Sequence, residues 1–188
     1  MEKITEIIKG CIAKNPKYQR VVYDLYRGYA IKIVFRYINR YDQALDVVND
    51  SFVKLFSNFQ KFDPSNDKDS EHILMGWFKR ILINTAIDEL RKDNMLREIG
   101  GIPDYVWDIK DDSQQADQML FYKDLMVAVK ALPTSYRVVF NLYVIDGYTH
   151  SEISDMIKIS IGTSKSSLSR ARTLLQNNIK KMENLKYA

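Results

Sequence analysis

Apolar residues recur every three or four positions along most of the 188-residue chain, and no segment alternates apolar with polar residues as a half-buried strand does. Only seven Gly and four Pro interrupt this spacing. The strongest example runs from Asp42 to Phe59, where six apolar side chains fall on one helical face: Leu45, Val48, Phe52, Leu55, Phe56 and Phe59. The pattern predicts an all-α protein.

Two segments break the helical spacing. The shorter, residues 62–70, is polar and contains Pro64, which cannot continue a helix. The longer, residues 100–118, begins with two glycines and a proline and holds five Asp against one Lys. We therefore expect two small helical domains, residues 1–99 and 119–188, joined by an acidic flexible linker at residues 100–118.

The second domain carries the pattern of a helix-turn-helix unit. One amphipathic helix is expected from Pro133 to near Gly147, with Val138, Val139, Leu142 and Tyr143 in the core. Thr149 and Glu152 then have the spacing of a capping box that opens a short helix, with Ile153, Met156 and Ile157 on its apolar face. After a tight turn, Ser160 can cap a second helix, which buries Leu168, Ala171, Leu174 and Leu175.

The outward face of that second helix carries basic side chains and small serine side chains. It carries Lys165, Ser166, Ser169, Arg170 and Arg172. Lys and Arg neutralise phosphates and bond to base edges, and serines let a helix approach the major groove closely. The face is thus predicted to bind DNA, although an ordinary helical hairpin with a solvated basic face would give the same pattern.

The helix at 42–59 has an acidic stripe opposite its apolar face. Asp42, Asp46 and Asp50 are four residues apart and lie on one line of the helix, with Asn49 beside them. Carboxylates on one helix without histidine match a metal site poorly, so we expect a docking surface for a basic partner. A merely solvated acidic face is the alternative.

A third polar face follows the short loop. Arg80, Asn84, Asp88 and Arg91 fall on one side of the predicted helix 77–92, flanked by Thr85 and Lys92. These residue types can hold phosphates and pair with an exposed base edge, and Trp77 and Phe62 offer rings for unpaired bases. An aromatic residue at this position of an amphipathic helix is more often part of the core.

Composition and charge exclude several classes of protein. The net charge is +4, and no apolar run approaches the ~20 residues that cross a bilayer, so we expect a cytoplasmic location. Cys11, His72 and His150 are too scattered for a metal cage or a general base, which predicts no catalytic residues, no metal, no cofactor and no small-molecule substrate. The lone Cys11 is expected to serve packing rather than redox sensing.

In this order, the segments resemble sigma-70 factors of bacterial RNA polymerase, specifically the extracytoplasmic-function (ECF) group. DQALDVVNDSFVKLF resembles the region-2 helix that docks on the polymerase β′ clamp, which implies docking by Asp46, Asn49 and Asp50. WFKRILINTAIDELRK is similar to the helix that melts and recognises the minus-ten element, with Asn84 and Asp88 at base-reading positions. GTSKSSLSRAR resembles the region-4 recognition helix for the minus-thirty-five element. Its GTSKS motif is most similar to the corresponding sequence in ECF sigma factors of Bacteroidetes.

The resemblance implies a function without catalysis. Domain 1–99 would be sigma region 2 and domain 119–188 sigma region 4, which also contacts the polymerase β flap. The partners implied are core RNA polymerase, promoter DNA and an anti-sigma factor, often membrane-embedded. The rival interpretation is a stand-alone helix-turn-helix regulator, which predicts dimers on palindromic sites.

Overall fold

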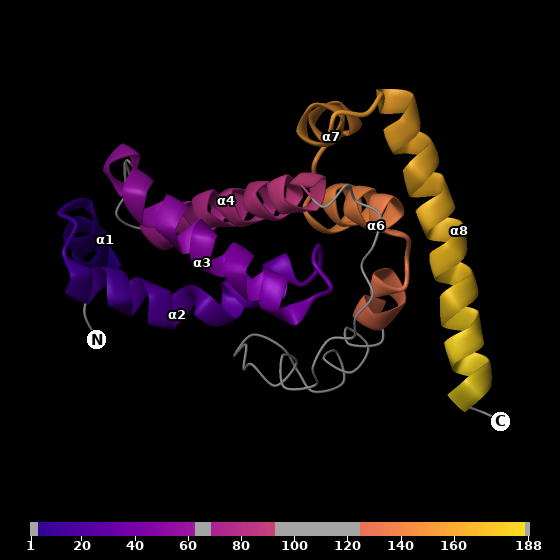
Figure 1. Ribbon diagram of the computed structural model, residues 1–188, viewed down its shortest axis with the longest axis horizontal. Coiled ribbons are helices and arrows are strands. Elements are labelled where there is room, and N and C mark those ends of the chain that lie inside the picture. Colours follow the sequence, from indigo (N-terminus) through magenta and orange to yellow (C-terminus); the bar gives the residue numbers. More distant parts are fainter. Residues whose placement is uncertain (1–3, 63–68, 93–124, 187–188) are drawn as a thin grey trace. The chain divides into compact units, whose positions relative to one another are not determined.

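In the computed structural model of the protein, the described residues are 4–62, 69–92 and 125–186, with side chains described through residue 180. They form helices and contain no strand (Figure 1), which confirms the predicted all-α class. The chain divides into two compact units, Met1–Glu89 and Leu90–Ala188. The predicted linker at 100–118 and Pro64 lie outside the described residues, so the domain boundaries stay a prediction.

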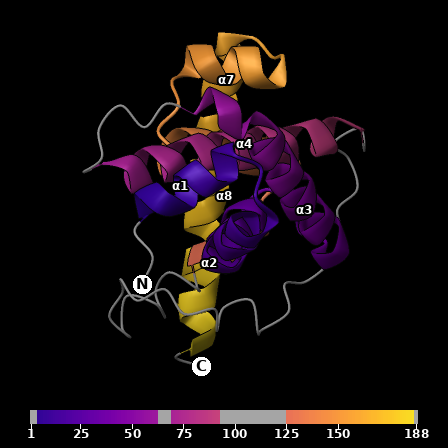
Figure 2. The same cartoon turned by 90° about the vertical axis from the view of Figure 1, so that its left-hand side faces the viewer.

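The first unit holds α1 (Ile4–Ile12), α2 (Pro16–Val34), α3 (Tyr41–Asn58), the short 3-10 helix η1 (Phe59–Lys61) and all but the last three residues of α4 (Ser70–Lys92). Local chemistry starts α2: Pro16 lacks the N–H that a first helical residue cannot use, and the Asn15 side chain accepts a hydrogen bond from the Lys17 amide at 3.0 Å. Helices α1, α2 and α3 lie side by side in sequence order (Figures 1 and 2).

Aromatic rings join α3 to its neighbours. The ring of Phe52 lies 4.7 Å from Tyr23 of α2 and 4.7 Å from Phe78 of α4, measured between centroids. Such tilted ring pairs stabilise the packing beyond the contribution of the buried apolar area. The predicted apolar face of the helix at 42–59 is therefore confirmed as the face that holds the first unit together, with Val48, Phe52, Leu55 and Phe59 fully buried.

After the end of α4, the described part of the second unit comprises helical residues 125–130, α6 (Thr134–Phe140), the π-helical turn η3 (Asn141–Ile145), α7 (His150–Ile157) and α8 (Ile161–Lys186). The predicted helix from Pro133 to near Gly147 is confirmed as α6 and η3 together. It ends at Gly147, whose φ of 78° is a conformation that suits glycine.

The π-helical turn corrects one predicted core residue. Val138, Val139 and Leu142 are buried as expected, but Tyr143 is 36% exposed. Tyr143 lies inside the wider turn in which the Asp146 amide donates to the Asn141 carbonyl five residues back, and the smaller rotation per residue in such a turn places it off the buried line.

The helix-turn-helix unit is confirmed with its predicted caps. Thr149 and Glu152 form the capping box of α7, and the Thr163 amide donates to Ser160 Oγ at 3.0 Å at the start of α8. Ile153 and Ile157 are buried, as are Leu168, Ala171 and Leu175. Leu174, predicted to be buried, is 37% exposed because it lies at the edge of the apolar stripe, about 100° around the helix from Leu175.

Candidate functional site

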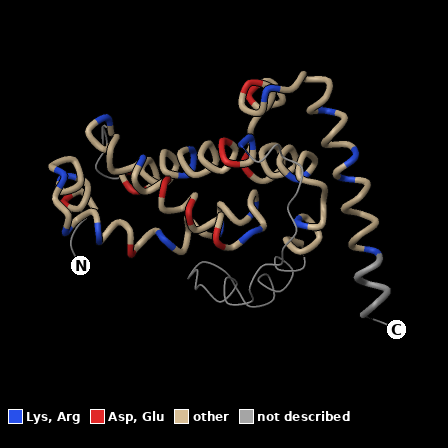
Figure 3. The backbone as a smooth tube through the Cα atoms, viewed as in Figure 1, with Lys and Arg blue, Asp and Glu red and all other residues tan. Residues whose placement is uncertain are grey.

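The exposed face of α3 gathers the acidic stripe. Asp42, Asp46, Asn49 and Asp50 are all exposed on it, as predicted. Figure 3 shows acidic residues in red along α3. The Tyr23 hydroxyl donates to Asn49 Oδ1 at 3.4 Å, and the Tyr23 ring is held against Phe52. The face thus presents carboxylates and one amide whose carbonyl oxygen already has a partner.

One residue on this face was missed by the sequence analysis. Val53 is 62% exposed and follows Asp50 by three and Asn49 by four residues, so it extends the acidic stripe with an apolar side chain. Its signal was available in the sequence, because Val53 lies off the spacing of the buried residues of this helix.

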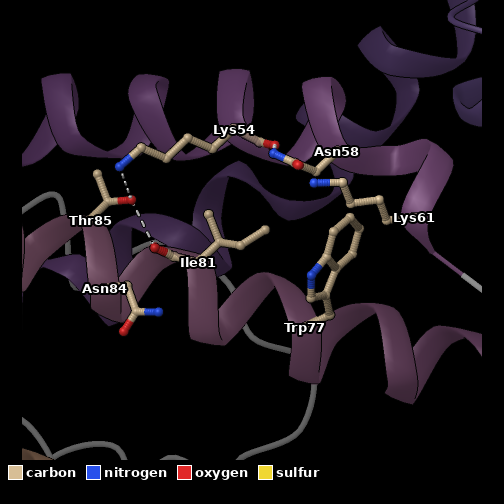
Figure 4. Close-up of a pocket in the computed structure, with 7 residues that line it drawn as sticks. All are labelled: Lys54, Asn58, Lys61, Trp77, Ile81, Asn84 and Thr85. Atoms are coloured by element: carbon tan, nitrogen blue, oxygen red, sulfur yellow. Dashed lines mark hydrogen bonds between the residues drawn. The ribbon is translucent and has the colours of Figure 1, made fainter. Parts of the chain in front are cut away.

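An open hollow of about 260 Å³ lies between α3 and η1 on one side and α4 on the other (Figure 4). Its lining is Lys54, Asn58, Lys61, Trp77, Ile81, Asn84 and Thr85. Lys54 Nζ donates to Thr85 Oγ1 at 3.1 Å, and the Thr85 hydroxyl donates to the Ile81 carbonyl at 2.8 Å. The hollow combines two ammonium groups, two amides and an indole ring, which suits an anionic, planar ligand.

The predicted face of α4 is partly joined to this hollow. Arg80, Asn84, Asp88, Arg91 and Lys92 are exposed, as expected of a binding face, and Asn84 is the one of them that lines the hollow. Lys54, Asn58 and Lys61 were not predicted. Their spacing of four and three puts them on one side of the chain, but they meet α4 only through the fold.

Phe62 and Trp77, both suggested to stack on unpaired bases, differ in their exposure. Phe62 is 8% exposed, and its ring stacks on Trp77 at 5.4 Å and packs edge-on against Phe59 at 5.9 Å. Phe62 therefore packs against Trp77 and is too buried to stack on a base. The expectation that Phe62 offers a ring to an unpaired base is wrong. Trp77 is half-buried and lines the hollow.

The outward face of α8 carries all five predicted DNA-binding residues in exposed positions: Lys165, Ser166, Ser169, Arg170 and Arg172. Ser164, Ser167, Leu168 and Ala171 occupy the opposite, buried side. From residue 161 to 180 the helix contains Lys and Arg but no Asp or Glu (Figure 3). Arg170 Nη1 donates to the Tyr136 hydroxyl of α6 at 3.4 Å.

The lone cysteine, Cys11, is placed as a packing residue. Cys11 is fully buried, and this burial raises the pKa of its thiol to about 11, so the nucleophilic thiolate is disfavoured. Within residues 4–62, 69–92 and 125–186, no three His, Cys, Asp or Glu side chains gather into a group able to hold a metal ion. Over the same ranges, no helix has the length and hydropathy needed to span a bilayer.

Comparison with known families matches both units. Residues 22–95 match the model of sigma-70 region 2, and residues 122–175 match the model of sigma-70, region 4, so that the two matches together cover more than half of the chain.

Individual relatives cover most of the chain. Over 169 residues, 25% are identical to the ECF RNA polymerase sigma factor SigW of Bacillus subtilis (strain 168), covering 85% of this chain and 87% of that protein. RNA polymerase sigma factor SigV of the same organism is 28% identical over 148 residues, 77% of this chain and 81% of that one. The fold resembles that of the sigma factor RpoE from Bartonella quintana, solved with the anti-sigma factor NepR, with a TM-score of 0.51, 22% identity and coverage of 86% of this chain and 96% of that one.

Proposed function

Because the chain belongs to the sigma-70 family, in the ECF group of RNA polymerase sigma factors, we propose that it binds core RNA polymerase and directs initiation at promoters with paired minus-ten and minus-thirty-five elements. The observation that carries the proposal is the pairing of the two matches, with a polar hollow in the region-2 unit and a basic helix-turn-helix face in the region-4 unit. Catalysis belongs to the core enzyme, and we infer that this chain supplies none.

We assign core docking to α3. The clamp of β′ would meet Asp46, Asn49 and Asp50, with Val53 as the apolar residue at their side. Exposed carboxylates steer a basic partner into register, and an apolar side chain excluded from water between them adds affinity.

We assign the unpaired minus-ten strand to the hollow between α3 and α4. Lys54 and Lys61 supply cations for backbone phosphates, Trp77 a partly exposed ring for stacking, and Asn84 an amide for a base edge. Stacking and pairing of this kind offset the few kcal/mol needed to unstack each base. Arg80, Asp88, Arg91 and Lys92 continue the same exposed side of α4 and extend the proposed contact with the strand.

Replacing Lys61 by glutamine is expected to weaken binding of a single-stranded minus-ten oligonucleotide by the holoenzyme. One lost phosphate contact lowers the slope of log affinity against log salt by about 0.7. The measurement is fluorescence anisotropy across a salt series, with Lys9→Gln on α1 as the matched control. Equal slopes for the Lys61 variant and the wild type would remove Lys61 from the strand site.

We assign minus-thirty-five recognition to α8, where Arg170 is central to the exposed basic face. The Arg170→Ala variant is expected to lower affinity for the matched element about 5- to 150-fold, because one good base contact contributes that much discrimination. The measurement is holoenzyme binding to promoters with matched and altered elements. Lys180→Ala, farther along the same helix, is the control, and an unchanged preference in the Arg170 variant would contradict the assignment.

The other partners follow from the same assignment. The Bartonella quintana relative is held by an anti-sigma factor, and we infer that an anti-sigma factor also covers the DNA-binding faces of this chain until a signal releases it. Tethering of that partner to a membrane stays a prediction, as does the cytoplasmic location, which is where core polymerase works. A stand-alone regulator is not favoured, since it gives no reason for the region-2 match at residues 22–95.

A further inference from the structure

Three side chains connect the π-helical turn, α7 and α8 at one point. The His150 ring stacks on the Tyr143 ring with centroids 4.4 Å apart and planes 22° from parallel. His150 Nδ1 lies 2.9 Å from Ser164 Oγ. Tyr143 belongs to η3, His150 is the first residue of α7, and Ser164 is the fourth residue of α8. We refer to these three residues as the His150 cluster.

The hydrogen bond in this cluster is partly buried. Ser164 is 0% exposed, whereas His150 and Tyr143 are partly exposed at the edge of the cluster. A buried hydroxyl without a partner is costly, so the bond to His150 holds Ser164 in one place. The bond is shorter than the 3.4 Å contact between Arg170 and the Tyr136 hydroxyl, which links α8 to α6 farther along the helix.

The position of Ser164 gives the bond a consequence for DNA contact. Lys165 and Ser166 follow it directly on the exposed face, in the second turn of α8. Farther along, Leu168, Ala171 and Leu175 are buried on the side of α8 that packs on α6. A helix is oriented by two separated points of attachment, and the His150 cluster provides the first while the apolar stripe provides the second.

We propose that His150 is a positioning residue for promoter recognition: its bond to Ser164 fixes the first turns of α8 and thereby sets how strongly the minus-thirty-five element is discriminated. This inference rests on the proposed function of α8. The start of α7 does not depend on the imidazole, because Thr149 and Glu152 cap that helix with their own hydrogen bonds, including one of 2.8 Å from the Thr149 amide to Glu152.

Two substitutions separate the hydrogen bond from the ring. His150→Phe keeps a ring to stack on Tyr143 but has no atom to bond with Ser164. His150→Asn removes the ring but can place an amide atom where Nδ1 lies. If the bond positions α8, the phenylalanine variant loses discrimination and the asparagine variant keeps it. A role in packing alone reverses this order.

The experiment measures transcription by holoenzyme from two promoters that differ only in the minus-thirty-five element, matched or scrambled, and takes the ratio. We expect His150→Phe and Ser164→Ala each to lower the ratio about tenfold, and the double variant to lower it no further, because both changes break the same bond. His72→Phe, an exposed histidine of α4, is the matched control. Circular dichroism melts establish that every variant is folded at the assay temperature.

The outcomes distinguish this inference from the function on which it rests. A wild-type ratio in folded His150→Phe overturns the positioning role, as does equal loss in the asparagine and phenylalanine variants. Equal transcription from matched and scrambled promoters by the wild-type protein instead contradicts the proposed function of α8 itself.

Discussion

Replacing Arg137 by methionine is expected to lower the free energy of unfolding of the second unit by about 2–4 kcal/mol, a large part of the stability of a small domain. Arg137 is 1% exposed, and its guanidinium donates to the carbonyls of Leu132 at 3.2 Å and Lys130 at 3.4 Å and to the Thr134 hydroxyl at 3.5 Å. These bonds close the turn between the helical residues 125–130 and α6.

Methionine fills much of the same volume, so the expected loss comes from the carbonyl groups left without their charged donor rather than from a cavity. The measurement is hydrogen exchange at the α6 and α8 amides as a function of urea concentration. These amides report the unfolding of the second unit separately from the first. Arg172→Met on the exposed face of α8 is the control. A change below about 0.5 kcal/mol in the Arg137 variant, the range of ordinary surface substitutions, would contradict the structural role.

The largest functional effect is expected from Asp50→Lys, which should weaken binding to core polymerase about a hundredfold while leaving the fold intact. Asp50 is exposed on α3, so the reversal disturbs no buried group, but it places a like charge against a basic docking partner. Because exposed charges are screened, the effect should shrink as salt rises from 0.05 to about 0.5 M.

Binding of fluorescently labelled protein to core polymerase tests this expectation, with Asp155→Lys on α7 as a variant of the same charge change in the other unit. If the two variants bind alike, general electrostatics rather than docking by α3 explains the affinity. Val53→Ser offers a second test of the same face, and it should also weaken core binding, because the one apolar side chain of the stripe is replaced by a small polar one without a change of charge.

Most of the fold was predictable because its signals are local. The Thr149–Glu152 capping box and Ser160 each start a helix through atoms only a few residues away. The exposed faces of α3, α4 and α8 were also predictable, since the 3.6-residue period alone decides which residues share a side.

The errors arise where distant segments meet or where a helix departs from α-helical geometry. Phe62 was assigned to base stacking but is covered by Phe59 and Trp77 through the packing of η1 on α4. Tyr143 leaves the core because a π-helical turn shifts the helix phase, and spacing alone does not reveal that turn. The hollow lined by Lys54 and Lys61 depends in the same way on how α3 and α4 pack, so its cationic side was absent from the predicted site.

The most direct test of the central claim is transcription by purified bacterial core polymerase, with and without this protein, from a pool of random upstream sequences whose transcripts are sequenced. We expect starts that appear only with the protein and share two upstream elements at a fixed separation, asymmetric rather than palindromic. Specific duplex binding by the protein alone, with no binding to core polymerase and no new starts, would contradict it.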